Sequence, residues 1–313
     1  MPHQMDGVTD MDGDIRSVAR LGLVHHMLYP LCTEDGEDHA RTLLEFVKRD
    51  DIETMDCCLP YGNALRAPLI PAVRDCGMVD ITFATHLYPL RKLGFTATAA
   101  NERGFARLVV ADMVEQAVAI GATGFIFASG EPAPGDASDA HYAAFREFCG
   151  WVCGELAPHG ITALLEPFDT DVDKKFLYGS TRACVDLIES LQPEVENFGI
   201  ELDVAHLPLM REEFGEAILT VAPYLKRVHL GNCVLRDSKH PRYGDTHPPI
   251  GYPPGEIDTP QVAEILRALL DVGYLDEGKR GNLVIEMTPW PGRTVEETIA
   301  DNMARLNEAW HMV

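Results

Sequence analysis

The sequence contains no long hydrophobic run. None of its apolar stretches reaches the roughly 18 residues that a membrane-spanning helix requires. Residues 1–14 are acidic and have no apolar centre of the kind that a secretory signal carries. These two features exclude an integral membrane protein and argue against export. We therefore expect a cytoplasmic protein with no membrane partner.

Positive charge is also scarce. Lysine and arginine together number 26, against 49 aspartates and glutamates, which gives a formal net charge of −23 at pH 7. A field of this sign repels phosphate backbones and anionic membranes, so the composition argues against a nucleic-acid partner. High solubility is the simplest interpretation of the acidic excess.

The cysteines lack the close paired spacing of zinc-binding motifs. Cys149 and Cys153 lie four residues apart on a predicted helix, where two buried small side chains are the common outcome. We expect all eight cysteines to be reduced: Cys32, Cys57, Cys58, Cys76, Cys149, Cys153, Cys184 and Cys233.

What the sequence does contain is a regular alternation of two kinds of segment. Short apolar segments predict buried parallel strands at 21–29, 52–58, 81–88, 124–129, 161–168, 198–204, 227–232 and 283–287. Segments with a helical spacing of apolar residues lie between them at 104–120, 141–156, 181–191, 211–222, 259–272 and 294–310. Thr259 with Pro260 indicates one helix start, and the Thr-x-x-Glu motif at 294–297 indicates another.

Repeated strand–helix units without a break in composition predict one domain with a parallel sheet covered by helices. Eight units in 313 residues favour a closed (β/α)8 TIM barrel over an open sheet. The open alternative, a doubly wound sheet, usually carries a G-x-G-x-x-G turn after its first strand, and none is present here. We expect residues 1–18 to form a tail and residues 19–313 to form the barrel.

One connection is abnormally long. Residues 233–258, rich in proline, glycine and histidine, separate the seventh predicted strand from the next helix. Loops of this length in a compact domain usually cover or bind something. Because the loop follows a strand, it belongs to the face where barrel active sites assemble, and we expect it to lie over that face. Residues 88–104 are a second candidate cover.

Four late strands each end close to a side chain that can bind a metal. Glu166 follows ITALL, Asp203 ends IEL, His229 lies in KRVHL and Glu286 follows LVI. A polar group is costly to bury there without a partner. Four such cases in successive strands predict one divalent cation held by three carboxylates and one imidazole.

A ligand set dominated by oxygen suits Mn²⁺, Mg²⁺ or Co²⁺, with Mn²⁺ the expected ion, whereas structural zinc would recruit thiolates. Four protein ligands leave about two positions for adjacent oxygens of a sugar. The cation would then stabilise the enediolate that forms when a carbon-bound proton leaves. Glu166 and Glu286 come from opposite sides of the ion, so one is expected to remove a proton and the other to return it.

Further polar and aromatic residues lie near strand ends or in the long loop. The candidates for substrate contact on this ground are His25, His86, His206, His247 and Trp290. The open alternative is a hydrogen-bonded or solvated rim residue for His25, His86 and His247, and a structural helix-start residue for His206. Arg227 and Glu201 precede the predicted ligands by two residues, and we expect them to form a salt bridge in a lower layer of the barrel.

The motifs LLEPFD, IELDVAH, VHLGN and VIEMTP resemble the xylose-isomerase-like barrel superfamily of sugar isomerases and epimerases. They are most similar to its ketose 3-epimerase and hydroxypyruvate or inosose isomerase branch, over about residues 20–310. The resemblance implies that Glu166, Asp203, His229 and Glu286 bind the metal and that the two glutamates exchange protons. It also implies substrate contacts from His206, in the pattern Asp-x-x-His, and from Arg236, shortly after the ligand histidine.

The long insert after the seventh strand departs from the short loop of simple epimerases. It resembles the catalytic subunits of bacterial C-glycoside deglycosidases, which cleave the carbon–carbon bond of 3-oxo-glucosides and pair with a small β-rich subunit. An isomerase or epimerase is therefore the first expectation and a carbon–carbon lyase the second. Family resemblance also implies a homo-oligomer, with a small partner subunit as an added option.

Two rival classes fit less well. An apurinic-site endonuclease shares the barrel, but it uses several zinc ions, more histidines and a basic surface, against which the net charge of −23 counts. A sugar-binding protein without catalysis would not need two carboxylates placed for proton exchange.

Overall fold

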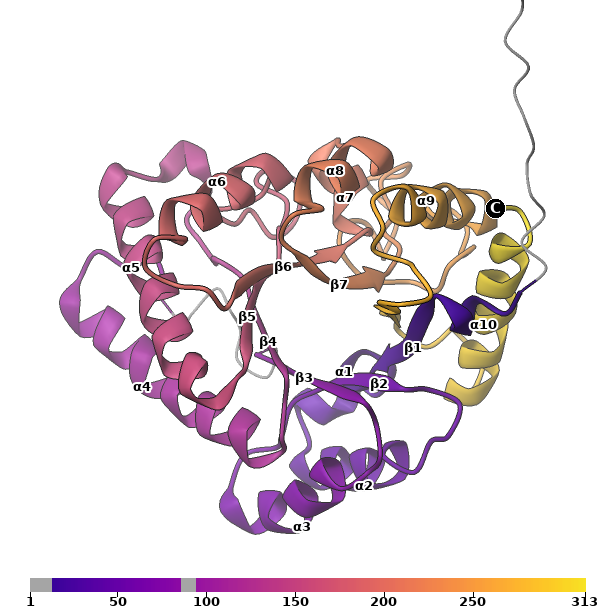
Figure 1. Ribbon diagram of the computed structural model, residues 1–313, viewed down its shortest axis with the longest axis horizontal. Coiled ribbons are helices and arrows are strands. Elements are labelled where there is room, and N and C mark those ends of the chain that lie inside the picture. The colour runs from indigo at the N-terminus through magenta and orange to yellow at the C-terminus, as the bar shows by residue number, and fades with distance from the viewer. Residues whose placement is uncertain (1–12, 86–93) are drawn as a thin grey trace, which may run out of the picture.

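The computed structural model describes residues 13–85 and 94–313. Eight parallel strands form a closed barrel in which each strand pairs with the next and β1 pairs with β8, and the helices surround it (Figure 1). The strands are β1 Ala19–Val24, β2 Thr54–Cys57, β3 Asp80–Ala84, β4 Gly124–Phe127, β5 Thr162–Leu165, β6 Phe198–Asp203, β7 Leu225–Leu230 and β8 Gly281–Ile285. The predicted (β/α)8 TIM barrel is confirmed.

The helices cover the outside of the barrel. They are α1 His25–Leu28, α2 Gly36–Phe46, α3 Asn63–Arg74, α4 Ala100–Ala119, α5 Asp139–Leu156, α6 Thr181–Leu191, α7 His206–Met210, α8 Phe214–Val221, α9 Thr259–Asp271 and α10 Val295–Trp310. Several predicted strands were too long, because buried residues continue past the end of the strand into the following loop or helix. The predicted strand 21–29, for example, ends at Val24 and α1 follows.

Two helix starts show how local sequence sets these boundaries. Thr294 accepts a hydrogen bond from the Glu297 amide while the Glu297 carboxylate accepts one from the Thr294 amide, as the capping box predicts. At α9 the cap is Asp258, not Thr259, and Gln261 completes the box. The predicted helix 211–222 begins only at Phe214, because Arg211 has a left-handed backbone (φ 61°) that ends α7.

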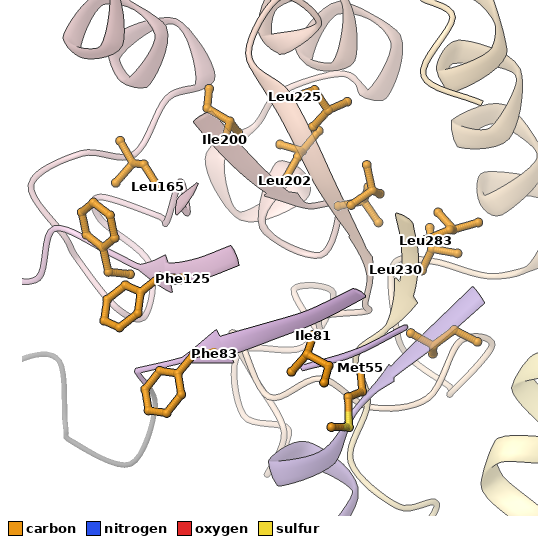
Figure 2. Packing of buried hydrophobic residues seen from close by; sticks show 14 of the residues in the cluster. Met55, Ile81, Phe83, Phe125, Leu165, Ile200, Leu202, Leu225, Leu230 and Leu283 are labelled. Carbon is orange, nitrogen blue, oxygen red and sulfur yellow. The ribbon is translucent and has the colours of Figure 1, made fainter. Parts of the chain in front are cut away.

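Strand periodicity separates the apolar core from the polar interior of the barrel. Along β6, Ile200 and Leu202 alternate with Glu201 and Asp203, and all four are buried. Figure 2 shows the apolar set, with Ile200 and Leu202 near Leu225 of the neighbouring β7. The alternate positions point the other way, so the acidic residues of β6 face the inside of the barrel.

The long connection 233–258 is ordered and packed. The Asn232 side chain ties its two ends together: its amide group donates to the Pro249 carbonyl, and its oxygen accepts from the backbone amides of Cys233 and Ile257. A short antiparallel bridge joins Val234 to Gly244. The loop also buries charged side chains, which places it against the polar end of the barrel.

The chain before the first strand differs from the prediction. Residues 13–18 lie against the barrel, whereas the sequence placed them in the tail. Ile15 in a short 3-10 helix is 3% exposed, and the indole of Trp310 donates a hydrogen bond to the Gly13 carbonyl. The apolar contact of Ile15 stabilises this start, and a three-residue turn is too short to show a periodic pattern.

Candidate metal centre

The four predicted ligands lie together at the end of the barrel where the strands finish. Ligand atoms of Glu166, Asp203, His229 and Glu286 all lie within 4.8 Å of one another. None of these side chains is more than 3% exposed. They come from successive strands, since Glu166 follows β5, Asp203 ends β6, His229 lies in β7 and Glu286 follows β8. The structure thus brings the predicted set into one buried cluster.

The two nitrogens of His229 face different partners. Nε2 lies 2.7 Å from a carboxylate oxygen of Asp56, and Nδ1 lies 2.6 Å from Glu286 Oε2 and 3.4 Å from Glu201 Oε1. Metal-binding histidines commonly donate their second ring N–H to a carboxylate, which fixes the tautomer. Asp56 occupies that position, so the Nδ1 lone pair is directed at the cluster.

Asp56 was not among the residues found from the sequence. It lies in β2, in the segment TMDC, and the signal for it was an acid near the end of a short apolar strand. It also pairs with Arg227, which donates further hydrogen bonds to Asp80 Oδ1 at 2.8 Å and to Thr54 Oγ1 at 2.8 Å. The predicted Arg227–Glu201 salt bridge is wrong, because the Arg227 guanidinium pairs with Asp56 and Asp80 instead.

Glu201 instead lies beneath the cluster, next to His229. It is fully buried, and neither of its carboxylate oxygens has a hydrogen-bond partner in the described part of the chain. Burial, together with nearby Asp203 and Glu286, raises the pKa of Glu201 to about 8 against the opposing effect of His229. Burial and the charges of Glu201 and Glu286 likewise raise the pKa of Glu166 well above its usual value.

The cluster therefore holds more negative charge than the protein itself balances. Five carboxylates surround one imidazole: Asp56, Glu166, Glu201, Asp203 and Glu286. Burial works against a charged imidazole, but the carboxylates raise the pKa of His229 well above its ordinary value. Buried acids at such distances need a cation or protons. The donor set, oxygen with one nitrogen, fits a hard or borderline divalent cation.

A second group of buried polar side chains adjoins the first. His206 and His247, both predicted as substrate contacts, lie beside Asp203 and beside Asp245 of the long loop. Lys174 pairs with Asp245 at 2.8 Å. Burial by itself would lower the pKa of both histidines, but the neighbouring carboxylates raise the pKa of His206 to about 9 and that of His247 to about 10. Asp245 was not among the residues found from the sequence, although its Asp-x-His spacing with His247 was an available signal.

The other described candidates for substrate contact are not part of this second group. His25 packs against α2, where its Nε2 lies 3.1 Å from Thr42 Oγ1 and its ring stacks on His39, so its contacts are those of a core histidine. Arg236 is exposed and pairs with Glu256 at 3.2 Å. Trp290 lies after β8 with its ring 5.5 Å from Tyr252. His86 is outside the described residues.

The cysteines have the state that the sequence predicted. All eight are free, and Cys149 and Cys153 are fully buried in the core. Burial raises the pKa of the Cys153 thiol to about 12, which removes its reactivity at neutral pH. None of the eight belongs to the acidic cluster.

Fold and site together define a parallel eight-stranded barrel with a buried acidic centre at the C-terminal ends of its strands. The chain belongs to the xylose isomerase-like TIM barrel family, whose model matches residues 69–309. No curated protein sequence matches it. Among the described residues no helix is long and apolar enough to cross a bilayer.

Solved structures with the same fold include sugar epimerases. A D-psicose 3-epimerase in the presence of D-fructose has a TM-score of 0.61 at 14% identity, over 94% of this chain and 96% of that one. A 3-keto-D-glucoside 4-epimerase from E. coli has a TM-score of 0.63 at 14% identity, over 92% and 99%. An AP endonuclease of family 2 from Brucella melitensis has a TM-score of 0.55 at 17% identity, over 89% and 96%. At these identities the likeness concerns the fold.

Proposed function

We propose that the protein is a divalent-metal-dependent isomerase or epimerase of a sugar or keto-sugar. The observation that carries this proposal is the buried cluster of Glu166, Asp203, His229 and Glu286 at the C-terminal mouth of the barrel. Barrel active sites form at this face. Family membership and the sugar epimerases among the structural neighbours support a carbohydrate substrate.

Within this proposal, Glu166 and Glu286 exchange protons with the substrate carbon. They follow β5 and β8, and ligand atoms of Asp203 and His229 lie with theirs in one cluster. A raised pKa, as found for Glu166, suits a carboxyl group that must hold a proton during part of the cycle. We propose Mn²⁺ as the cation bound here. It would act as a Lewis acid on adjacent sugar oxygens.

A carbon–carbon lyase acting on 3-oxo-glycosides is the alternative. The ordered loop 233–258 favours it, because the loop lies after β7 and buries charged groups at the active-site end of the barrel. Such a loop adds surface for a larger substrate than a free sugar. Both proposed reactions begin with removal of a carbon-bound proton. They differ in the next step, which returns a proton in the epimerase and releases the aglycone in the lyase.

Three further proposals concern the protein's setting. Eight free cysteines fit the reducing cytoplasm. A homo-oligomer, with or without a small partner subunit, is proposed on the resemblance to the sugar isomerases alone. The net charge of −23 supports the absence of a nucleic-acid partner.

The first test is proton exchange. Manganese-loaded protein is incubated in D₂O with D-psicose, D-tagatose or a 3-keto-D-glucoside, and NMR follows deuterium at the carbon next to the carbonyl. Incorporation with return of an epimer supports the isomerase, and release of an aglycone from a C-glycoside supports the lyase. If no substrate of either class gains deuterium or turns over, the proposed chemistry is wrong.

The second test assigns the proton-exchanging residue. Glu286→Gln keeps the size of the side chain and removes its basicity, so we expect turnover to fall at least about a hundredfold while the fold persists. Glu277→Gln, at an exposed position before β8, is the matched control and should retain activity. Activity of Glu286→Gln near that of the control would remove Glu286 from the mechanism.

A further inference from the structure

Three side chains of metal-binding type meet in the first strand–helix unit of the barrel. His25 begins α1, Cys32 lies in the 3-10 helix Pro30–Thr33, and His39 lies in α2. Both histidines are fully buried, and Cys32 is 2% exposed. One nitrogen or sulfur atom from each lies within 4.8 Å of the other two. This His–Cys–His group shares no residue with the acidic cluster.

The hydrogen bonds of Thr42 fix the proton on His25. The Thr42 hydroxyl has one proton to donate, and its acceptors are backbone carbonyls of α2, with the Asp38 oxygen at 2.9 Å and the His39 oxygen at 3.2 Å. In its 3.1 Å contact with Thr42 Oγ1, His25 Nε2 must therefore be the donor. The other nitrogen of the neutral ring, Nδ1, then carries a lone pair.

His39 is held in the same tautomer. Its Nε2 lies 2.9 Å from the Cys58 carbonyl oxygen, which only accepts, so Nε2 carries the proton. Burial lowers the pKa of His39, against the opposing effects of the Cys58 and Cys32 backbone and of Asp38. Burial and the charge of His39 lower the pKa of His25 well below its ordinary value. Both rings are therefore neutral at pH 7, and each presents its Nδ1 lone pair.

The two lone pairs meet inside the protein without a donor. His25 Nδ1 and His39 Nδ1 are buried and have no hydrogen-bond partner in the described part of the chain. The two rings stack with centroids 5.4 Å apart, and the ring of Phe46 packs edge-on against His25 at 5.3 Å. The Cys32 thiol donates its weak hydrogen bond to the His26 carbonyl oxygen at 3.8 Å. Buried acceptors in apolar surroundings are costly to leave unpaired, so this arrangement calls for a ligand.

The charge of the group is compatible with a divalent cation. Two neutral imidazoles and one thiolate carry one negative charge, so a bound divalent ion leaves one positive charge. The nearby carboxylate of Asp38, which acts on both Cys32 and His39, stabilises a charge of that sign. Burial, with the charge of Asp38, raises the pKa of the Cys32 thiol to about 12, and an ion that binds here displaces this proton to solvent.

We propose that His25, Cys32 and His39 bind Zn²⁺ through the two Nδ1 atoms and the sulfur. Thiolate and imidazole are the usual ligands of zinc, and three protein ligands leave its fourth position to a water molecule. A donor set without a carboxylate does not suit Mg²⁺ or Ca²⁺. Histidines that donate the second ring N–H to a fixed acceptor are typical metal ligands.

The zinc ion joins α1, the 3-10 helix and α2, and so stabilises the connection that follows β1. The expectation of a single cation is thereby revised to two separate centres of different chemistry. His25 is assigned to the zinc centre instead of to the substrate.

Cobalt absorption tests this site without reference to turnover. A thiolate bound to Co²⁺ gives a strong charge-transfer band in the near ultraviolet, which oxygen and nitrogen ligands do not give. The full chain is stripped with a chelator, kept reduced without added thiols, and titrated with Co²⁺ in the absence of oxygen. Because the acidic cluster contains no cysteine, this band reports the His–Cys–His group.

We expect the band in the wild type and its loss in Cys32→Ala. Cys184→Ala, which removes another fully buried thiol outside the group, is the matched control and should keep the band. His39→Gln retains the thiol but removes a nitrogen ligand, so its Co²⁺ affinity at this band should fall at least about tenfold. Circular dichroism establishes that each variant is folded, and His39→Gln decides if Cys32→Ala is not.

Zinc itself gives the second readout. Excess Zn²⁺ should displace the cobalt and remove the band. By elemental analysis of zinc-saturated protein, Cys32→Ala should hold one equivalent less than Cys184→Ala. This difference does not depend on how many ions the acidic cluster binds.

The absence of a thiolate band in the cobalt-saturated wild type overturns the proposal, as does a band that persists unchanged in a folded Cys32→Ala or His39→Gln variant. Equal zinc contents of Cys32→Ala and Cys184→Ala overturn it as well. A protein that shows the band but exchanges no deuterium refutes the proposed enzymatic function and leaves the zinc site standing.

Discussion

Replacement of Asp56 by asparagine tests how the barrel holds His229. Asp56 contacts His229 Nε2 with one oxygen and Arg227 with the other, and it is fully buried. The amide keeps the shape of the side chain but removes the negative charge. Its oxygen can serve only one of the two donors, and its NH₂ group lies against the other. His229 should therefore lose its fixed tautomer. Arg227 should lose one of its two carboxylate partners, Asp56, and keep Asp80.

The size of both effects follows from these contacts. Loss of the carboxylate behind a metal-binding histidine lowers metal affinity about 10- to 100-fold, which is about 1.4–2.8 kcal/mol. Arg227 retains Asp80 and Thr54, so the full cost of breaking a buried ion pair does not apply. We expect a loss of about 1.5–3 kcal/mol in the free energy of unfolding, the range of one hydrogen bond to a charged group.

Two measurements separate these effects. Calorimetric titration of the chelator-stripped chain with Mn²⁺ gives the affinity, and urea denaturation of the metal-free chain gives the stability. Asp80→Asn is the matched control, because Asp80 also binds Arg227 but has no contact with His229 among the described residues. Asp80→Asn should lower stability with little change in affinity. Equal manganese affinity in Asp56→Asn and the wild type would refute the orienting role of Asp56.

Two further predictions concern space and pH. Gly231→Ala places a methyl group against Asp203 and His247, so its affinity for Mn²⁺ in calorimetric titration should fall below that of the wild type, and an unchanged affinity would show that these side chains can shift to make room. Burial raises the pKa of Asp80, but Arg227 outweighs it and lowers the pKa below the ordinary value of an aspartate. The ion pair is therefore fully formed above the unfolded pKa of about 4 and is lost as the pH falls through the lower folded pKa. Urea midpoints of the wild type and Asp80→Asn should differ most near pH 7 and converge as the pH falls through the lowered pKa of Asp80; a constant difference would contradict this.

The fold was predictable because it depends on patterns that repeat. Each strand is a short apolar run, and the capping box of Thr294 marks a helix start by local hydrogen bonding alone. Glu166, Asp203, His229 and Glu286 could be found because each interrupts or ends such a run, where an acid or imidazole stands out against apolar neighbours. The closed barrel then follows from the number of strand–helix units.

The remaining site residues could not be placed from the sequence for physical reasons. Asp56 lies in a predicted strand, 52–58, but its role depends on contacts with Arg227 and His229 of β7, on another part of the barrel, which the sequence does not reveal. Asp245 belongs to an irregular loop, where no periodicity indicates which side chains turn inward. His25 was expected at the end of the predicted strand 21–29, near the barrel mouth, but α1 begins at this position and its ring lies beside Thr42 of α2.

Charge balance explains why the acidic cluster needs a cation. Six buried carboxylates lie at the mouth: Asp56, Glu166, Glu201, Asp203, Asp245 and Glu286. Arg227 pairs with Asp56, Lys174 pairs with Asp245, and the raised pKa values of His206, His229 and His247 add positive charge. Neither carboxylate oxygen of Glu201 has a hydrogen-bond partner in the described residues, and a neutral buried carboxyl needs an acceptor for its O–H. A divalent cation held by the cluster of Glu166, Asp203, His229 and Glu286 would stabilise the remaining negative charge in this low-dielectric interior.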